Sequence, residues 1–183
     1  MLMALKAAQN RAWEALQRVA SNRTYPIAVG GIAFLFTISM TIPFASILIG
    51  AILVRRDRWI AIVLLASLGS STGGVLLYLV FHHFGWDQIT TLYPSLADSQ
   101  AWSDATKWVS AYGTLALLVF AASPFPQMPA LIFTAVTQLP VLDVYLALLV
   151  GKLLKYAVYG WLAARFPSLA IRFLRLVGFN WNE

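Results

Sequence analysis

Three long stretches of this 183-residue chain contain no Asp, Glu, Lys or Arg, and this distribution of charge constrains the fold most strongly. They lie between Arg23 and Arg55, from Trp59 to Trp86, and between Lys107 and Asp143. Only 11% of the residues are charged, less than half of the usual share of about 25%, while 60% are hydrophobic. A water-soluble globule of this size cannot bury so much apolar surface, so we expect an all-α integral membrane protein.

Prolines interrupt the first and the third of these stretches. One crossing takes about 20 apolar residues, which residues 59–81 supply, but the stretches before Arg55 and Asp143 have roughly 31 and 35. The first contains Pro43, and the third contains Pro124, Pro126 and Pro129. Because three prolines within six residues cannot continue a helix, we predict re-entrant helical hairpins at 26–54 and 108–142. A break of this kind is tolerated at membrane depth only where protein or a water-filled cavity satisfies the freed backbone groups.

Positive charge gives the topology independently, because basic clusters favour the cytoplasmic side. Lysine and arginine flank the first hairpin on both sides, so it enters and leaves on one side. Residues 59–81 then cross, residues 82–107 form an outer loop, and residues 144–164 cross back. The resulting plan is an N-terminal amphipathic interfacial helix (1–24), one membrane domain (25–167) and an amphipathic C-terminal tail (168–183), with both ends cytoplasmic in a multi-pass protein.

The two halves share this order of hairpin and spanning helix in opposite orientations. A short echo supports a repeat, since Gly73-Gly74-Val75-Leu76-Leu77-Tyr78 aligns with Gly151-Lys152-Leu153-Leu154-Lys155-Tyr156. Inverted repeats with broken helices that meet near the bilayer midplane are a recurrent plan among transporters. The pattern therefore favours transport.

Lys152 and Lys155 are the most informative residues, because they lie near the centre of the last span on one helix face. A charge at the midplane costs at least about 2.5 kcal/mol, so both must face protein or water. We interpret them as a binding point for an anionic headgroup, and we expect that headgroup to be a phosphate. The alternatives are that they donate to free carbonyls of the hairpins or that they reach the membrane surface.

The proline-broken tips are the second group of candidates. Free backbone groups there could coordinate a headgroup or an ion, and nearby polar side chains add partners. The candidate substrate-binding residues are Lys152, Lys155, Ser123, Pro124, Pro126, Gln127, Pro43 and Tyr156. A purely architectural break is the alternative. Gly69-Ser70-Ser71-Thr72-Gly73-Gly74 lacks the ending of a phosphate loop, so we assign Gly69 and Gly73 to close helix packing.

An enzymatic role has weaker support. His82 and Asp87 have the spacing of the His-Asp pair in glycerolipid acyltransferases, but no downstream substrate motif follows. We find no catalytic constellation, no metal-ligand set and no implied cofactor, and we expect that the chain is not an enzyme. The basic residues lie in clusters between apolar runs, which favours membrane lipids over nucleic acid as partners, and a homo-oligomer is compatible with so short a chain.

The run from Tyr112-Gly113 to Pro167 resembles the second half of DedA-type proteins, the SNARE-associated Golgi or VTT-domain superfamily. Gly151-Lys152-Leu153-Leu154-Lys155-Tyr156 is similar to a segment of its small YqaA-like branch, and residues 43–85 resemble the first half. The resemblance implies two inverted re-entrant hairpins with spanning helices in a bacterial inner membrane. It also implies movement of a lipid between leaflets, a phospholipid or an isoprenoid-phosphate carrier, with a role in membrane homeostasis.

The chain differs from that family at two points. It has no acidic residue in the first hairpin, and its second tip, Ser123 to Pro129, lacks the family's Gly and Arg. We hypothesise that Lys152 and Lys155 supply the missing positive charge. Three functions remain: a lipid translocase or scramblase, a non-transporting assembly factor that binds partners, and a lipid enzyme centred on His82 and Asp87.

Overall fold

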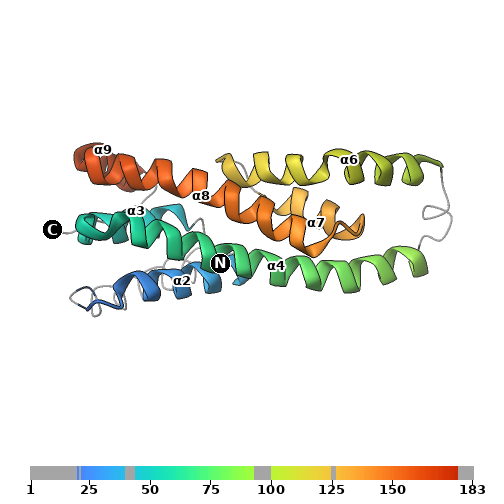
Figure 1. The fold of residues 1–183 in the computed structure, drawn as a ribbon, viewed down its shortest axis with the longest axis horizontal. Helices are drawn as coiled ribbons and strands as arrows, with labels where there is room; N and C mark the ends of the chain where they lie inside the picture. Colours follow the sequence, from blue (N-terminus) through green and yellow to red (C-terminus); the bar gives the residue numbers. More distant parts are fainter. Residues whose placement is uncertain (1–19, 21, 40–43, 93–99, 125–126, 177–183) are drawn as a thin grey trace. The chain divides into compact units, whose positions relative to one another are not determined.

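The structure, a computed structural model, is helical throughout the part of the chain that it describes, which is residues 20, 22–39, 44–92, 100–124 and 127–176. The α-helices are α2 (Tyr25–Ser39), α3 (Ala45–Val54), α4 (Trp59–Leu92), α6 (Gln100–Ala122), α7 (Met128–Val136), α8 (Val141–Arg165) and α9 (Pro167–Leu176), and the 3-10 turn η1 (Arg56–Arg58) precedes α4 (Figure 1). The expected all-α class is confirmed.

Prolines and one residue in the left-handed backbone conformation mark the ends of several helices. Pro129 lies in the first turn of α7, where the missing N–H costs nothing. Gln138, with φ 58°, takes the left-handed conformation that ends α7, and the N–H of Leu139 donates to Thr134 O over 3.2 Å. Pro167 separates α8 from α9.

Residues 82–107, which we expected to form an outer loop, are helical over much of their length. Helix α4 continues to Leu92, and α6 already begins at Gln100. We placed the loop by the positions of charged residues, which indicate the membrane border. Charged residues do not end a helix, so α4 can continue beyond that border. Helix α4 ends two positions before Pro94 in the sequence, and proline disfavours a helical conformation in the residue that precedes it.

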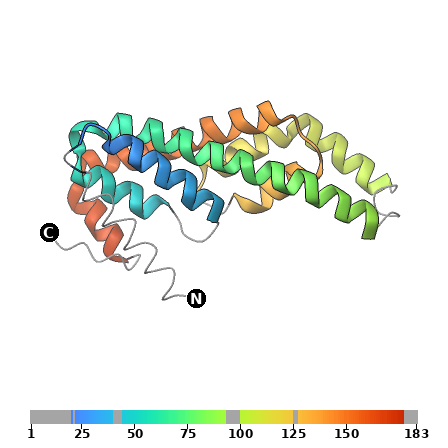
Figure 2. The same ribbon diagram turned by 90° about the horizontal axis from the view of Figure 1, so that it is seen from below.

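The chain divides into two compact units, and α4 and α8 each contribute to both. Unit 1 comprises residues 1–73 and 153–183, and its described part holds α2, α3, α9, the first part of α4 and the last part of α8. Its core is centred on α3, in which every residue from Ser46 to Leu53 is buried. Helix α9 packs against α3 (Figure 2).

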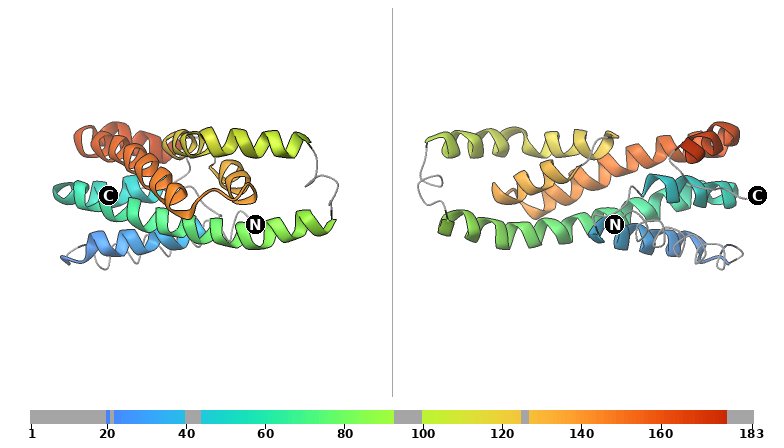
Figure 3. Two further views of the ribbon diagram at one scale, coloured as in Figure 1. Left: turned by 45° about the vertical axis from the view of Figure 1, so that its right-hand side comes forward. Right: turned by 180° about the vertical axis from the view of Figure 1, so that it is seen from behind.

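Unit 2 comprises residues 74–152, with α6, α7, the last part of α4 and the first part of α8. Helices α6 and α7 are neighbours (Figure 3). The core includes Tyr78, Val109, Leu117, Leu131 and Leu148. Each unit therefore contains two helices joined at a proline-containing break, together with parts of the two long helices.

One helical segment in the described part of the chain, the 30-residue Arg56–Gly85, is long and apolar enough to cross a membrane, and an 18-residue window within it has a mean hydropathy of 2.0. The second expected crossing, residues 144–164, falls within α8, which does not meet the same criterion. Lys152 and Lys155 lower the apolar character of that helix.

Candidate functional site

The break between α6 and α7 lies in unit 2 next to a glycine of α8. A Cβ added at Gly151 would lie 2.7 Å from both Ala121 Cβ and Leu118 O, so the last turn of α6 is in close contact with α8. Ser123 and Pro124 follow this turn directly, and Gln127 precedes α7. Pro126, another predicted site residue, lies outside the described residues.

Lys152 follows Gly151 and is buried, with only 2% of its surface exposed. A Cβ added at Gly74 of α4 would lie 3.6 Å from Lys152 Nζ and 2.9 Å from Leu148 Cδ1. Such a Cβ would be in ordinary contact with the lysine head group, whereas it would crowd Leu148 Cδ1. A buried ammonium group is retained only where polar or charged groups compensate for lost hydration. Unit 2 thus places a cation in its interior, one residue from the contact with α6.

Gln127 adds a polar group to the same unit. Its Oε1 atom is buried and has no hydrogen-bond partner in the part of the chain that the structure describes. A buried acceptor without a partner costs about 1–3 kcal/mol, so such groups usually mark a site for water, an ion or a ligand. Of the polar side chains that the sequence singled out in this unit, Lys152 is buried, Gln127 is half-buried with its Oε1 atom buried, and Ser123 is half-buried and donates to Phe120 O over 2.9 Å.

The remaining predicted residues belong to unit 1. Tyr156 is buried, and its ring centroid lies 5.8 Å from that of Phe44. Phe44 directly follows Pro43, which lies outside the described residues. Lys155, one position before Tyr156, is half-buried. In unit 1, α8 therefore contacts the end of the break between α2 and α3 through an aromatic pair.

A chain of hydroxyl groups in unit 1 was not predicted as a site. Ser70 Oγ lies 3.2 Å from the Tyr156 hydroxyl and 2.7 Å from Thr37 Oγ1, and Thr37 Oγ1 donates to Ala33 O over 2.8 Å. These contacts join α8, α4 and α2. The available signal is the presence of Ser70 and Ser71 within an apolar helix, in the segment Gly69–Gly74 that the sequence analysis interprets through its glycines.

The prediction that Gly69 and Gly73 serve close packing is confirmed. A Cβ added at Gly69 would overlap the backbone oxygen of Gly30 in α2, and one added at Gly73 would lie 2.9 Å from Phe34 O. Both distances are shorter than real Cβ contacts. Helices α2 and α4 therefore approach with backbone against backbone in unit 1.

His82 has a structural environment at the end of α7. Its Nδ1 atom lies 3.1 Å from Ala135 O, and its ring stacks on Tyr78 with centroids 5.4 Å apart. The Tyr78 hydroxyl donates to Leu139 O. These contacts join α4 to the backbone at the end of α7 and just beyond it, where Ala135 O also accepts from the Gln138 N–H. Position 87 also lies in α4, and the side chain of Asp87 is outside the described residues.

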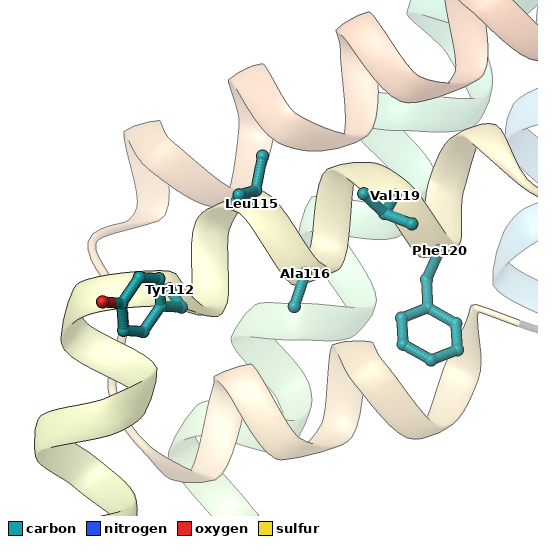
Figure 4. Close-up of a pocket in the computed structure, with 5 residues that line it drawn as sticks. All are labelled: Tyr112, Leu115, Ala116, Val119 and Phe120. Carbon is teal, nitrogen blue, oxygen red and sulfur yellow. The ribbon is translucent and has the colours of Figure 1, made fainter.

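A shallow apolar groove runs along the outer side of α6 in unit 2. Tyr112, Leu115, Ala116, Val119 and Phe120 line it (Figure 4), and its volume is about 450 Å³. The groove contains none of the predicted site residues. Its side chains offer contact with an apolar neighbour and no group for acid, base or nucleophilic chemistry other than the Tyr112 phenol.

No protein-family model, no curated protein and no solved structure matches the chain. The residues of the chain and their geometry therefore carry the functional inference.

Proposed function

We propose that the chain is a multi-pass membrane protein of DedA type that moves a lipid between leaflets, either a phospholipid or an isoprenoid-phosphate carrier. The buried Lys152 of unit 2 is the observation that carries this proposal. In this proposal α4 and α8 cross the bacterial inner membrane, α2–α3 and α6–α7 are re-entrant hairpins, and both chain ends are cytoplasmic.

The exposed surface supports the membrane placement. Large apolar side chains are exposed along the membrane-length segment of α4, and others are exposed on α6 and α8; examples are Leu64, Leu68, Leu76, Leu115, Val119, Leu154 and Val158. Soluble monomers rarely expose large contiguous apolar patches, so large apolar side chains that recur in exposed positions along these helices favour a lipid environment. Lipid chains would cover it at no cost, since they are as apolar as leucine.

The placement of Lys152 supports an anionic cargo. A lysine at membrane depth costs at least about 2.5 kcal/mol and is therefore expected to have a function. A lipid phosphate would compensate its charge. Gln127 Oε1 supplies a buried acceptor in the same unit, which a hydroxyl or ammonium group of a headgroup could satisfy.

The organisation of the units supports an internal repeat. In unit 1, Gly73 of α4 contacts α2, and in unit 2 its aligned partner Gly151 of α8 contacts α6. The aligned tyrosines are both buried: Tyr156 packs beside the first break, and Tyr78 bonds to the backbone after α7. The two glycines therefore make the same kind of contact, with the first helix of each pair, which favours duplicated halves.

Translocation in liposomes tests the proposal. Purified protein would be reconstituted with fluorescent phospholipids or a labelled isoprenoid phosphate, and transfer between leaflets would be followed by quenching of the outer label. We expect wild-type protein to move at least one lipid. The Lys152→Met/Lys155→Met variant should lose about tenfold or more of that rate, because it lacks the positive charge that attracts the headgroup. A tenfold loss corresponds to ~1.4 kcal/mol in the barrier to transfer.

Lys107→Met is the matched control, because Lys107 is exposed in unit 2 and forms an ion pair with Asp104 at 3.6 Å. Retained transport in this variant, together with unchanged helix content in both, would assign the loss to the lysines of α8. If wild-type protein moves no lipid, with or without a pH gradient, the proposal is wrong and a non-transporting assembly factor becomes the better explanation.

A further inference from the structure

Several elements that carry arginine meet at one end of unit 1. These are the start of α2, the turn η1 between α3 and α4, the end of α8, and α9 (Figures 1 and 2). The arginines whose side chains are described there are Arg23, Arg55, Arg56, Arg58, Arg165 and Arg172, and Asp57 is the single carboxylate among the described residues of this unit. We call this set of arginines the basic end of unit 1.

Two of these arginines have structural tasks. Arg55 donates to both carboxylate oxygens of Asp57 over 2.9 Å, and its Nη1 donates to Ala20 O over 2.8 Å. Arg58 Nη1 donates to Arg23 O over 3.1 Å. Arg55 and Arg58 therefore hold the segment before α2 against the turn, and Asp57 is already paired with Arg55.

The other arginines of the basic end present their side chains to the surroundings. Arg23, Arg56, Arg165 and Arg172 are all exposed. Four guanidinium groups with one neutralised carboxylate produce an excess of positive charge that attracts anions. Guanidinium groups bind phosphate oxygens through paired N–H donors, so phosphate is the anion that this surface fits best.

Apolar side chains lie on the same elements as these arginines, and they favour a lipid phosphate over a dissolved anion. Helix α9 is strongly amphipathic: Ala170 and Leu174 are buried in the core of unit 1, whereas Leu169 is 57% exposed. Phe166 is also exposed, and its ring lies edge-to-face with Trp161 at 5.8 Å. Apolar and aromatic groups beside arginines are typical of a helix that lies at a membrane surface, and a dissolved anion would leave them in water.

We propose that the basic end of unit 1 binds the headgroups of anionic phospholipids, with Arg23, Arg56 and Arg172 on the phosphates and Phe166 and Leu169 among the acyl chains. The site depends on the membrane placement proposed above but not on lipid transport. It is separate from the residues of unit 2 that are proposed to receive the cargo, and its lipids are bound partners of the folded protein.

Binding of lipids to the full-length protein in neutral detergent micelles tests this site. Native mass spectrometry would count the lipids retained when phosphatidylglycerol or phosphatidylcholine is added, and thermal unfolding would record the stabilisation by each. We expect wild-type protein to retain several times more phosphatidylglycerol and to be stabilised by it. Inorganic phosphate at the same concentration should give little stabilisation.

The Arg23→Gln/Arg56→Gln/Arg172→Gln variant should lose this preference, while the corresponding triple lysine variant should keep most of it, because charge is retained. Arg165 is left unchanged because a cation also stabilises the C-terminal end of α8. Lys107→Gln, an equally exposed charge removed from unit 2, should keep the wild-type preference. If the triple variant folds poorly, Arg56→Gln alone suffices, because no described contact of this exposed side chain supports the fold.

Two results would overturn the proposal. One is a glutamine variant that is folded and still prefers phosphatidylglycerol as strongly as wild-type protein does. The other is stabilisation by inorganic phosphate equal to that by phosphatidylglycerol, which would identify a site for a dissolved anion. Loss of transport in the Lys152→Met/Lys155→Met variant with lipid retention unchanged would separate this site from the proposed cargo site.

Discussion

Gly69 shows how a single missing side chain fixes the distance between two helices in unit 1. A methyl group there would overlap the backbone oxygen of Gly30, and backbone cannot rotate away as a flexible side chain can. We expect Gly69→Ala to destabilise the protein by about 3 kcal/mol or more, at the upper end of overpacking costs. Thermal unfolding in detergent measures this loss.

Gly31→Ala is the matched control for that substitution, because a Cβ at this position would meet nothing within 4 Å. It should be neutral or stabilising by up to about 1 kcal/mol, the difference in helix propensity between the two residues. Equal destabilisation by both alanines would show that helix backbone flexibility, and not the contact between α2 and α4, explains the effect.

Asp57 provides a second effect of a single residue, on the pH dependence of stability. Hydrogen bonds from Arg55 hold the pKa of this carboxyl below its ordinary value of 3.8. Because the folded-state pKa is lowered, the contribution to stability is complete above the ordinary pKa and declines as the pH falls below it. The wild-type advantage over Asp57→Asn in unfolding temperature should therefore be present at neutral pH and shrink in acid. An advantage that grows in acid would contradict this assignment.

At the scale of helices, the hydroxyl chain of unit 1 predicts an order of effects. Ser70→Ala removes the middle member, so both Thr37 and Tyr156 lose a contact, and we expect a loss of about 1–3 kcal/mol. Tyr156→Phe keeps the ring beside Phe44 and leaves Ser70 its contact with Thr37, so the loss should be about 1 kcal/mol or less. Chemical unfolding would measure the free energy of unfolding of both variants. A larger loss in Tyr156→Phe than in Ser70→Ala would show that the row of hydroxyl groups does not join the helices.

The helices also show which features the sequence could predict. Proline chemistry is local, so the separation of α2 from α3 and of α6 from α7 followed from the positions of the prolines. The glycine contacts of α4 followed from residue size. The hydroxyl chain did not, because Ser70 acquires its partners from α2 and α8, and their register against α4 depends on packing far along the chain. Likewise, the division of α4 and α8 between two units is invisible in a pattern of apolar residues.

For the whole molecule, the proposed topology predicts which positions are accessible from each side of the membrane. The natural chain contains no cysteine, so single cysteines can be labelled without background. An impermeant maleimide added to intact cells should label Asp104→Cys, and it should label Arg56→Cys only after the cytoplasmic side is opened. Leu48→Cys, at a fully buried position, should resist labelling from either side. Labelling of residues 56 and 104 from the same side would exclude a crossing by α4.

The division into units has a consequence for biosynthesis. Unit 2 is an uninterrupted stretch of chain, whereas unit 1 is built from segments on both sides of it. The core around α3 includes Tyr156, Ala163, Ala170 and Leu174, which the ribosome adds only after residue 152. Helices α2 and α3 must therefore wait, without all of their final neighbours, while all of unit 2 is translated. During that interval the insertion machinery or a chaperone would have to shield them, and a ribosome stalled near residue 152 would leave the core of unit 1 incomplete.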